Sequence, residues 1–127
     1  ITAWADAPAG AHATLGPYLD AAWLPIIGPT STAALRHLAG LVDDGPTTVD
    51  PADIAHAIGV GHRTGRNAPL AVALQRLNRF GLIQLDPHQI NVRVLLPRLS
   101  AHQLDRLPPA VARRALDTHN ALTGTGK

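Results

Sequence analysis

The stretch from Val49 to Ile83, VDPADIAHAIGVGHRTGRNAPLAVALQRLNRFGLI, is the most informative part of this chain. Its first part predicts a short helix that begins at Asp50-Pro51, because aspartate can accept a hydrogen bond from a first-turn amide and proline fits the first helical position. Gly59 ends this helix. The residues expected to face inward are Ile54, Ala55 and Ile58.

A second helix is predicted over Ala68–Phe80, after a turn formed by residues 61–66. Asn67 is expected to cap this helix, and Pro69 is tolerated because first-turn amides lack intrahelical partners. At about 100° per residue, the apolar residues gather on one side of the helix. These are Leu70, Ala73, Leu74 and Leu77. The opposite, mixed face holds Ala68, Val72, Gln75, Arg76 and Arg79.

A β-hairpin is predicted directly after this helix. Gly81 permits the left-handed turn that ends the helix, and Leu82–Leu85 then pairs with Ile90–Leu95 across the proline-containing turn Asp86–Gln89. Apolar residues alternate with Asn91 and Arg93, so these two side chains are expected to face solvent.

Helices are also predicted on both sides of this core. Residues 1–16, rich in Ala, Gly and Pro, are expected to form a flexible arm. A short helix over residues 17–27 then ends near Pro25, and Gly28-Pro29 separates it from a helix that is capped by Thr30 or Ser31 and runs to Val42.

The C-terminal part is expected to form two more helices over residues 100–121. Ser100 caps a helix over Ala101–Leu107, and Pro108-Pro109 opens the last helix. Its predicted inward residues are Val111, Ala112, Ala115 and Leu116. Residues 124–127 are expected to fray. The predicted organisation is one domain over 17–123, with its core at 31–96.

Composition limits the class of protein. The chain has 127 residues, 46% of them hydrophobic, and no cysteine, which suits one domain without disulfides or a Cys-based zinc site. The longest apolar run, residues 21–27, is far shorter than the roughly 20 residues that cross a bilayer. No membrane partner and a cytoplasmic location are therefore expected. The chain begins at Ile1 and contains no Met, so we expect it to be a trimmed or partial sequence.

Charge is distributed unevenly along the chain. Residues 1–60 hold six Asp and one Arg, whereas residues 61–127 hold ten Arg and Lys and three Asp. The basic half begins at the turn between the two helices of the opening stretch. Such asymmetry is typical of a face that binds anions, including nucleic-acid phosphates.

The order of helices and hairpin resembles the winged helix-turn-helix superfamily of prokaryotic regulators. Residues of the pattern Ile/Leu-Ala-x-x-Leu-Gly-Val precede that family's recognition helix, and Leu-x-x-Leu-x-x-x-Gly-Leu-Ile ends it. The matching residues here are Ile54, Ala55, Ile58, Gly59, Val60, Leu74, Leu77, Gly81, Leu82 and Ile83.

The loop before the recognition helix is also similar to that of uncharacterised proteins from actinobacteria and their phages, which carry Gly-x-Gly…Gly-Arg-Asn-x-Pro. The first resemblance implies a mostly α fold with a small β-hairpin, a winged helix-turn-helix with extra N- and C-terminal helices. Unlike most members of that superfamily, this chain has the longer turn GHRTGR between its two helices.

The resemblance implies a transcriptional regulator that binds double-stranded DNA. Turn residues would hold phosphate beside a helix N-terminus, the outer face of the second helix would contact base edges, and the hairpin would contact the backbone. The candidate DNA-binding residues are Arg63, Thr64, Arg66, Asn67, Val72, Gln75, Arg76, Arg79, His88 and Arg93. Each has a simpler alternative as a solvated turn, a helix cap or an ordinary polar helix face.

Two other functions remain open. A winged helix can act as a protein–protein adaptor, with Ala68 and Val72 on an apolar contact face. An enzyme would need His and Asp residues to converge from distant positions, because the seven histidines show no i,i+4 pair and no catalytic motif accompanies Ser31 or Ser100. We therefore expect no catalytic residues, no metal and no cofactor. Tyr18 and Trp23 are expected to pack within the fold. The alternative is a homodimer, formed through the N-terminal helix that carries these two residues or through the C-terminal helices.

Overall fold

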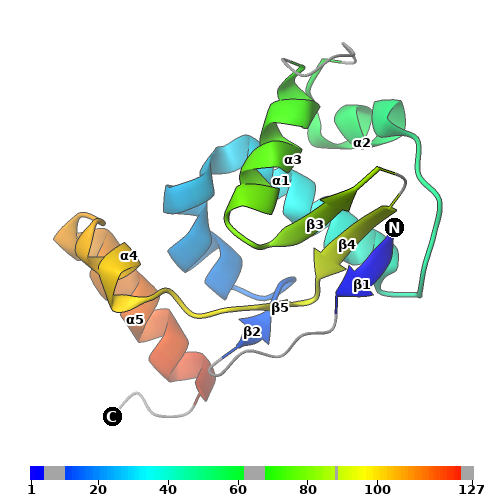
Figure 1. The fold of residues 1–127 in the computed structure, drawn as a ribbon. Helices are drawn as coiled ribbons and strands as arrows, with labels where there is room; N and C mark the ends of the chain where they lie inside the picture. Colours follow the sequence, from blue (N-terminus) through cyan, green and yellow to red (C-terminus); the bar gives the residue numbers. More distant parts are fainter. Residues whose placement is uncertain (5–10, 62–67, 88, 124–127) are drawn as a thin grey trace.

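The computed structural model describes residues 1–4, 11–61, 68–87 and 89–123. It is mostly helical, with a small three-stranded mixed sheet and a separate pair of short antiparallel strands (Figure 1). The elements in chain order are β1 (Thr2–Trp4), β2 (His12–Ala13), the π-helix η1 (Leu19–Trp23), α1 (Leu24–Val42), α2 (Pro51–Ile58), α3 (Pro69–Arg79), β3 (Ile83–Asp86), β4 (Gln89–Arg93), β5 (Leu95–Leu96), α4 (Ala101–Asp105) and α5 (Pro109–Thr123). No helix among the described residues is long and apolar enough to span a membrane.

The predicted hairpin is present as β3 and β4, which pair antiparallel with Asp86 opposite Gln89. The second predicted strand, Ile90–Leu95, is divided, because β4 ends at Arg93 and the next strand, β5, pairs with β2. β4 is the central strand of its sheet, with β3 on one side and β1 on the other.

The N-terminal residues do not form the predicted arm throughout. β1 pairs parallel with β4, so that Trp4 lies opposite Arg93, and His12–Ala13 pairs antiparallel with Leu95–Leu96. The prediction of an unstructured arm is wrong for these two segments. The N-terminal end of the chain completes the sheet that begins with the hairpin (Figure 1).

The predicted break at Gly28 is present inside α1. Gly28 has φ 84° and ψ 168°, a conformation that strongly favours glycine because it has no Cβ. The helix before the break continues past Pro25, and Pro29 starts the segment after it. Ser31 does not act as the predicted cap, since its buried hydroxyl donates to the Ala73 carbonyl of α3 at 3.2 Å.

Both predicted ends of α2 are confirmed. The Asp50 carboxylate accepts a hydrogen bond from the Ala52 amide at 2.9 Å, with Pro51 at the first helical position. Gly59 closes the helix with φ 80°, and its amide bonds to the Ala55 and His56 carbonyls.

The start of α3 differs from the prediction. Ala68 is the N-cap, without a side-chain hydrogen bond, and Asn67, the predicted cap, lies outside the described residues. Ala68 is only 5% exposed, so its placement on the outer face is wrong. The backbone of Ala68 is extended and turns its methyl group into the protein.

The C-terminal helices begin where the sequence predicts. Ser100 and Gln103 form a reciprocal capping box at the start of α4, and α5 starts at Pro109. The inward face of α5 carries Ala115 and His119, both buried, whereas Leu116 is 39% exposed and therefore not the inward residue that was predicted.

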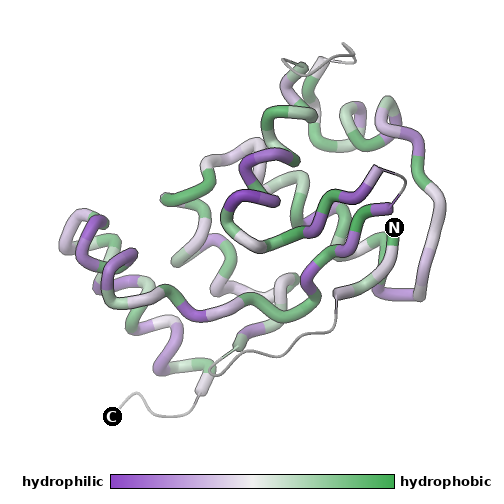
Figure 2. The backbone as a smooth tube through the Cα atoms, viewed as in Figure 1, coloured by the Kyte–Doolittle hydropathy of each residue, from purple (hydrophilic) through white to green (hydrophobic). Residues whose placement is uncertain are grey.

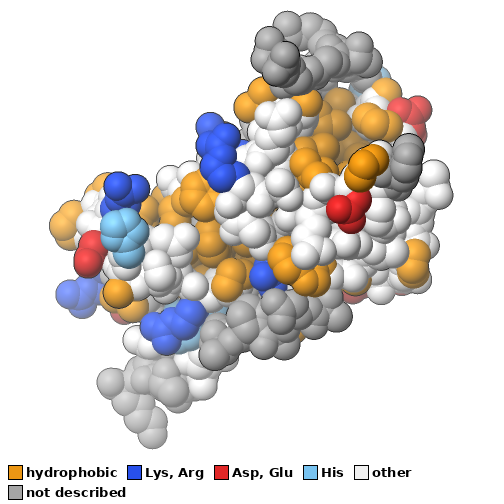
Figure 3. Space-filling view, in the orientation of Figure 1, with side chains coloured by type: hydrophobic (Ala, Val, Ile, Leu, Met, Phe, Trp, Pro, Cys, Tyr) orange, Lys and Arg blue, Asp and Glu red, His pale blue; other side chains and the backbone are white. Residues whose placement is uncertain are grey.

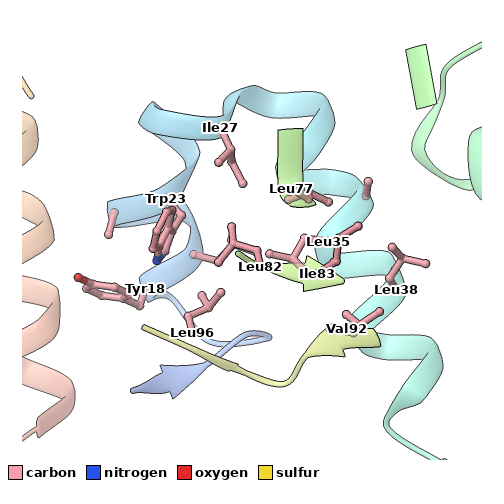
Figure 4. Packing of buried hydrophobic residues seen from close by; sticks show 14 of the residues in the cluster. Tyr18, Trp23, Ile27, Leu35, Leu38, Leu77, Leu82, Ile83, Val92 and Leu96 are labelled. Carbon is pink, nitrogen blue, oxygen red and sulfur yellow. The ribbon is translucent and has the colours of Figure 1, made fainter. Parts of the chain in front are cut away.

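One apolar core connects these elements (Figure 4). It includes Trp23 from η1, Leu35 from α1, Leu77 from α3 and Val92 from β4, all at most 2% exposed. The Trp23 indole N–H donates to the Pro97 carbonyl at 3.0 Å.

The core also contains Tyr18, whose hydroxyl accepts from the Leu99 amide at 2.9 Å. Tyr18 and Trp23 are each 2% exposed. The expected packing of Tyr18 and Trp23 is confirmed, and their burial leaves neither side chain exposed for the alternative, a dimer contact.

Candidate nucleic-acid interface

Helix α3 is held in place by its apolar face. Leu70, Ala73 and Leu77 are buried, and the Ser31 hydroxyl of α1 bonds to the backbone of α3 at Ala73. These contacts fix the rotation of the helix about its axis, so they also fix which residues face solvent.

The outer face of α3 is a stripe of four exposed residues, Val72, Gln75, Arg76 and Arg79. Their spacing of i, i+3, i+4 and i+7 places them along one side of the helix. We call these four residues the α3 stripe. Figure 2 shows that hydrophilic residues concentrate in the C-terminal half of α3. The helical period therefore predicted these four positions as exposed, and the structure brings them together.

Arg76 is the one member of the stripe whose side chain forms a hydrogen bond with another described residue. Its Nη1 donates to the Ile27 carbonyl at 3.1 Å, just before the break at Gly28. An arginine has five N–H donors, so one bond leaves the guanidinium able to bind a further acceptor. The hydrogen bond to Ile27 therefore keeps the positive charge of Arg76 at the edge of α3.

Gln75 and Arg79 make no side-chain hydrogen bond or ion pair with the described residues. They lie one helical turn apart and both are exposed. Their polar atoms are therefore free to bind a ligand from solvent.

Asn78 joins α3 to the hairpin. Its side-chain oxygen accepts from the Leu85 amide of β3 at 3.1 Å. This residue was absent from the predicted site, although its position next to Arg79 on α3 was visible in the sequence. Asn78 therefore links the C-terminal turn of α3 to the hairpin.

Polar side chains also connect the three strands. Asn91 Nδ2 donates to Gln84 at 3.0 Å, and Asn91 Oδ1 accepts from the Thr2 hydroxyl at 2.6 Å. Gln89 donates to the same Thr2 hydroxyl at 2.8 Å. This network runs across β3, β4 and β1 and supports the hairpin from its N-terminal neighbour.

Arg93 is not available at the surface. It is 9% exposed, its Nε donates to the Gly81 carbonyl at 2.6 Å, and its guanidinium lies 3.9 Å from the centre of the Trp4 ring. The prediction that Arg93 faces outward is wrong, because Trp4, which lies opposite Arg93 on β1, covers its guanidinium. The side chain fills a structural position beneath Trp4.

The remaining predicted residues lie outside the described residues. These are Arg63, Thr64, Arg66, Asn67 and His88. On the face shown in Figure 3, the described Arg side chains are separated from one another, without one continuous basic area. The α3 stripe is thus the part of the predicted interface that the described residues assemble.

A buried histidine pair lies in a different part of the molecule. His12 Nε2 and His119 Nδ1 are 2.6 Å apart, which makes them hydrogen-bonding partners, and the two side chains join β2 to α5. Burial lowers the pKa of both imidazoles, and the positive charge of Arg98 lowers both further. No local sequence pattern could reveal this pair, because the two residues are 107 positions apart.

Metal binding has no support at the histidine pair. Among the described residues, no three His, Cys, Asp or Glu side chains lie close enough together to hold a metal ion. The Tyr18 ring is the other close neighbour, with its centre 4.2 Å from that of His12. Both contacts of His12, with His119 and with Tyr18, lie in the buried region between β2 and α5.

No protein-family model, curated protein or solved structure matches this chain. The geometry of the α3 stripe and of its supports thus carries the functional argument.

Proposed function

We propose that this protein is a winged helix-turn-helix regulator that binds double-stranded DNA through the α3 stripe. The observation that carries the proposal is the exposed pair Gln75 and Arg79, which has no partner among the described residues and lies beside the tethered Arg76. The order of α2, α3 and the β3–β4 hairpin supports the same proposal, since it matches the element order of that superfamily.

The residue types suit a DNA groove. Glutamine can form two hydrogen bonds with the edge of adenine, and arginine can bind guanine or a phosphate. The exposed methyl groups of Val72 are suited to contact a thymine methyl. We assign Gln75 to base contact and Arg79 to phosphate contact.

The hairpin provides the second contact with the backbone in this proposal. Asn78 fixes the hairpin relative to α3, and the Asp86–Gln89 pair places its turn at the end of β3. The turn residues Arg63 and Arg66 and the hairpin residue His88 remain predictions from the sequence alone.

A gel-shift assay with pooled genomic duplex fragments at low salt tests this proposal. The wild-type protein should shift the DNA, Arg79→Ala should weaken binding about fivefold to tenfold on all fragments, and Gln75→Ala should reduce the preference among fragments. Arg106→Ala is the matched control, because Arg106 is an exposed arginine at the end of α4 and outside the stripe. Failure of the wild-type protein to shift any fragment would exclude the proposal.

One observation favours a second function, that of a protein–protein adaptor. Val72 is 44% exposed and lines a hollow of about 270 Å³ together with Ile27 and Pro29. Such a hollow suits an apolar side chain of a partner protein. Ala68 does not contribute to this surface, because it is buried.

Val72→Asp tests the adaptor. If the protein works in this way, the variant should lose its protein partner in a pull-down while it keeps the wild-type thermal midpoint. A partner that still binds the variant would exclude Val72 as the contact.

A further inference from the structure

One flank of α5 forms a second surface that no other described element covers completely, since most of its residues are exposed. The inward side of the helix packs through Ala115 and His119, and another side forms a shallow hollow of about 420 Å³ next to Pro17. The α5 residues that line this hollow are Ala110, Arg113, Arg114, Asp117, Thr118, Ala121 and Leu122. We call these seven residues the α5 flank.

The charges of the α5 flank are not neutralised within the described part of the chain. Among the described residues, Arg36 and Asp20 form an ion pair. Arg113, Arg114 and Asp117 are all exposed and take no part in it. The flank therefore offers both signs of charge to a partner, together with the exposed side chain of Leu122.

The flank is complementary to itself when it is reversed. Six of its residues are arranged symmetrically about the midpoint between positions 115 and 116. A two-fold axis through this midpoint pairs Ala110 with Ala121, Arg113 with Thr118, and Arg114 with Asp117. Small residues then meet at each end, opposite charges meet near the centre, and no like charges face each other.

A parallel arrangement would not have this property. It would place Arg114 opposite Arg114 and Asp117 opposite Asp117, which is repulsive in both cases. The charge pattern therefore selects the antiparallel arrangement, in which Leu122 also meets the exposed, apolar Pro109.

We propose that a second copy of this chain binds the α5 flank, with the two α5 helices antiparallel about a two-fold axis. In such an isologous interface each contact occurs twice, so the Arg114–Asp117 pair is formed on both sides of the axis. In Figure 1, α5 lies on the opposite side of the molecule from α2 and α3. The dimer leaves both α3 stripes open, and it does not depend on the proposed DNA binding.

Sedimentation equilibrium of the full chain without DNA tests this proposal. The wild-type mass should rise with concentration from the 13.3 kDa of one chain to twice that value. Arg114→Asp and Asp117→Arg should each remain at the single-chain mass, because each places like charges opposite one another. Arg106→Asp should behave as wild type, since Arg106 lies outside the flank.

An equimolar mixture of Arg114→Asp and Asp117→Arg provides the decisive comparison. In the mixed dimer each substituted residue meets an opposite charge, so the mixture should recover the doubled mass. Circular dichroism of each variant shows that it is folded. A wild-type protein that stays at the single-chain mass, variants that dimerise as wild type does, or a mixture that fails to recover the dimer would each overturn the proposal.

Discussion

Arg93 illustrates how one charged residue can become part of the interior. Its guanidinium donates to the Gly81 carbonyl and stacks on Trp4, and the hydroxyl of Thr14 bonds to its backbone carbonyl at 2.8 Å. These contacts join the end of α3, the first strand and the central strand. Arg93 stabilises the fold at the point where three separate parts of the chain meet.

Arg93→Ala should therefore lower the free energy of unfolding by about 2–4 kcal/mol, since it removes a charge-assisted hydrogen bond and a cation–π contact. Urea unfolding at neutral pH measures this loss. The exposed Arg79→Ala is the matched control and should change stability by no more than about 0.5 kcal/mol. Equal effects of the two substitutions would contradict the structural role of Arg93.

At the scale of the elements, the break in α1 separates two helical directions. Gly28 has a positive φ, and a Cβ built at this position would lie 3.3 Å from Nη1 of Arg76. The break therefore also makes room for the arginine that is tethered to Ile27.

Gly28→Ala should destabilise the protein by about 1–2 kcal/mol, because an L-residue is strained at this φ. Gly40→Ala, in the same helix, is the control. A Cβ at Gly40 meets nothing within 4 Å, so that substitution should stabilise the helix by about 0.5–1 kcal/mol. Thermal unfolding of both variants measures the two changes in stability, which should have opposite signs. A Gly28→Ala variant that is more stable than the wild-type protein would contradict backbone strain at Gly28.

The contact between β2 and α5 should depend on pH. Burial lowers the pKa of both His12 and His119 below 6.5. The pKa of His12 is lowered further by the charge of His119 and then by that of Arg98. The pKa of His119 is lowered further by the charge of Arg98. The unfolded chain then binds more protons than the folded chain just below pH 6.5. The contribution of the two neutral histidines to the stability of the folded state is thus complete above pH 6.5. It is lost as the pH falls from 6.5 through the lowered pKa values.

Urea unfolding at about pH 7.5, 6.5 and 5.5 tests this dependence. The wild-type protein should lose stability on acidification, and the double variant His12→Gln/His119→Gln should lose less. His102→Gln is the control, because His102 is exposed on α4, and it should keep the wild-type dependence. An identical pH dependence in the wild-type protein and the double variant would rule out the histidine pair as its source.

At the scale of the whole molecule, features set by neighbouring residues could be predicted from the sequence. The cap at Asp50, the left-handed Gly59, the break at Gly28 and the capping box at Ser100 depend on a few consecutive residues. The exposure of the α3 stripe also followed from one helical period.

Features set by distant segments could not be predicted in this way. Arg93 is buried because β1, almost 90 positions earlier in the chain, pairs with β4. His119 replaces Leu116 on the inward face of α5 because His12 reaches it from β2. Tyr18 and Trp23 are also buried by a distant segment of the chain. Tyr18 bonds to the backbone of Leu99 and Trp23 to that of Pro97, so neither side chain is exposed to a second copy.

If the α3 stripe binds duplex DNA as we propose, the affinity for DNA should depend on the salt concentration. The measurement is the affinity of the wild-type protein and of Arg79→Ala for one random-sequence duplex, by fluorescence anisotropy, from about 50 to about 200 mM salt. The wild-type affinity should fall linearly in logarithmic coordinates, and Arg79→Ala should bind more weakly with a slope reduced by about 1. A wild-type affinity that does not change with salt, or an Arg79→Ala slope equal to the wild-type slope, would contradict the claim.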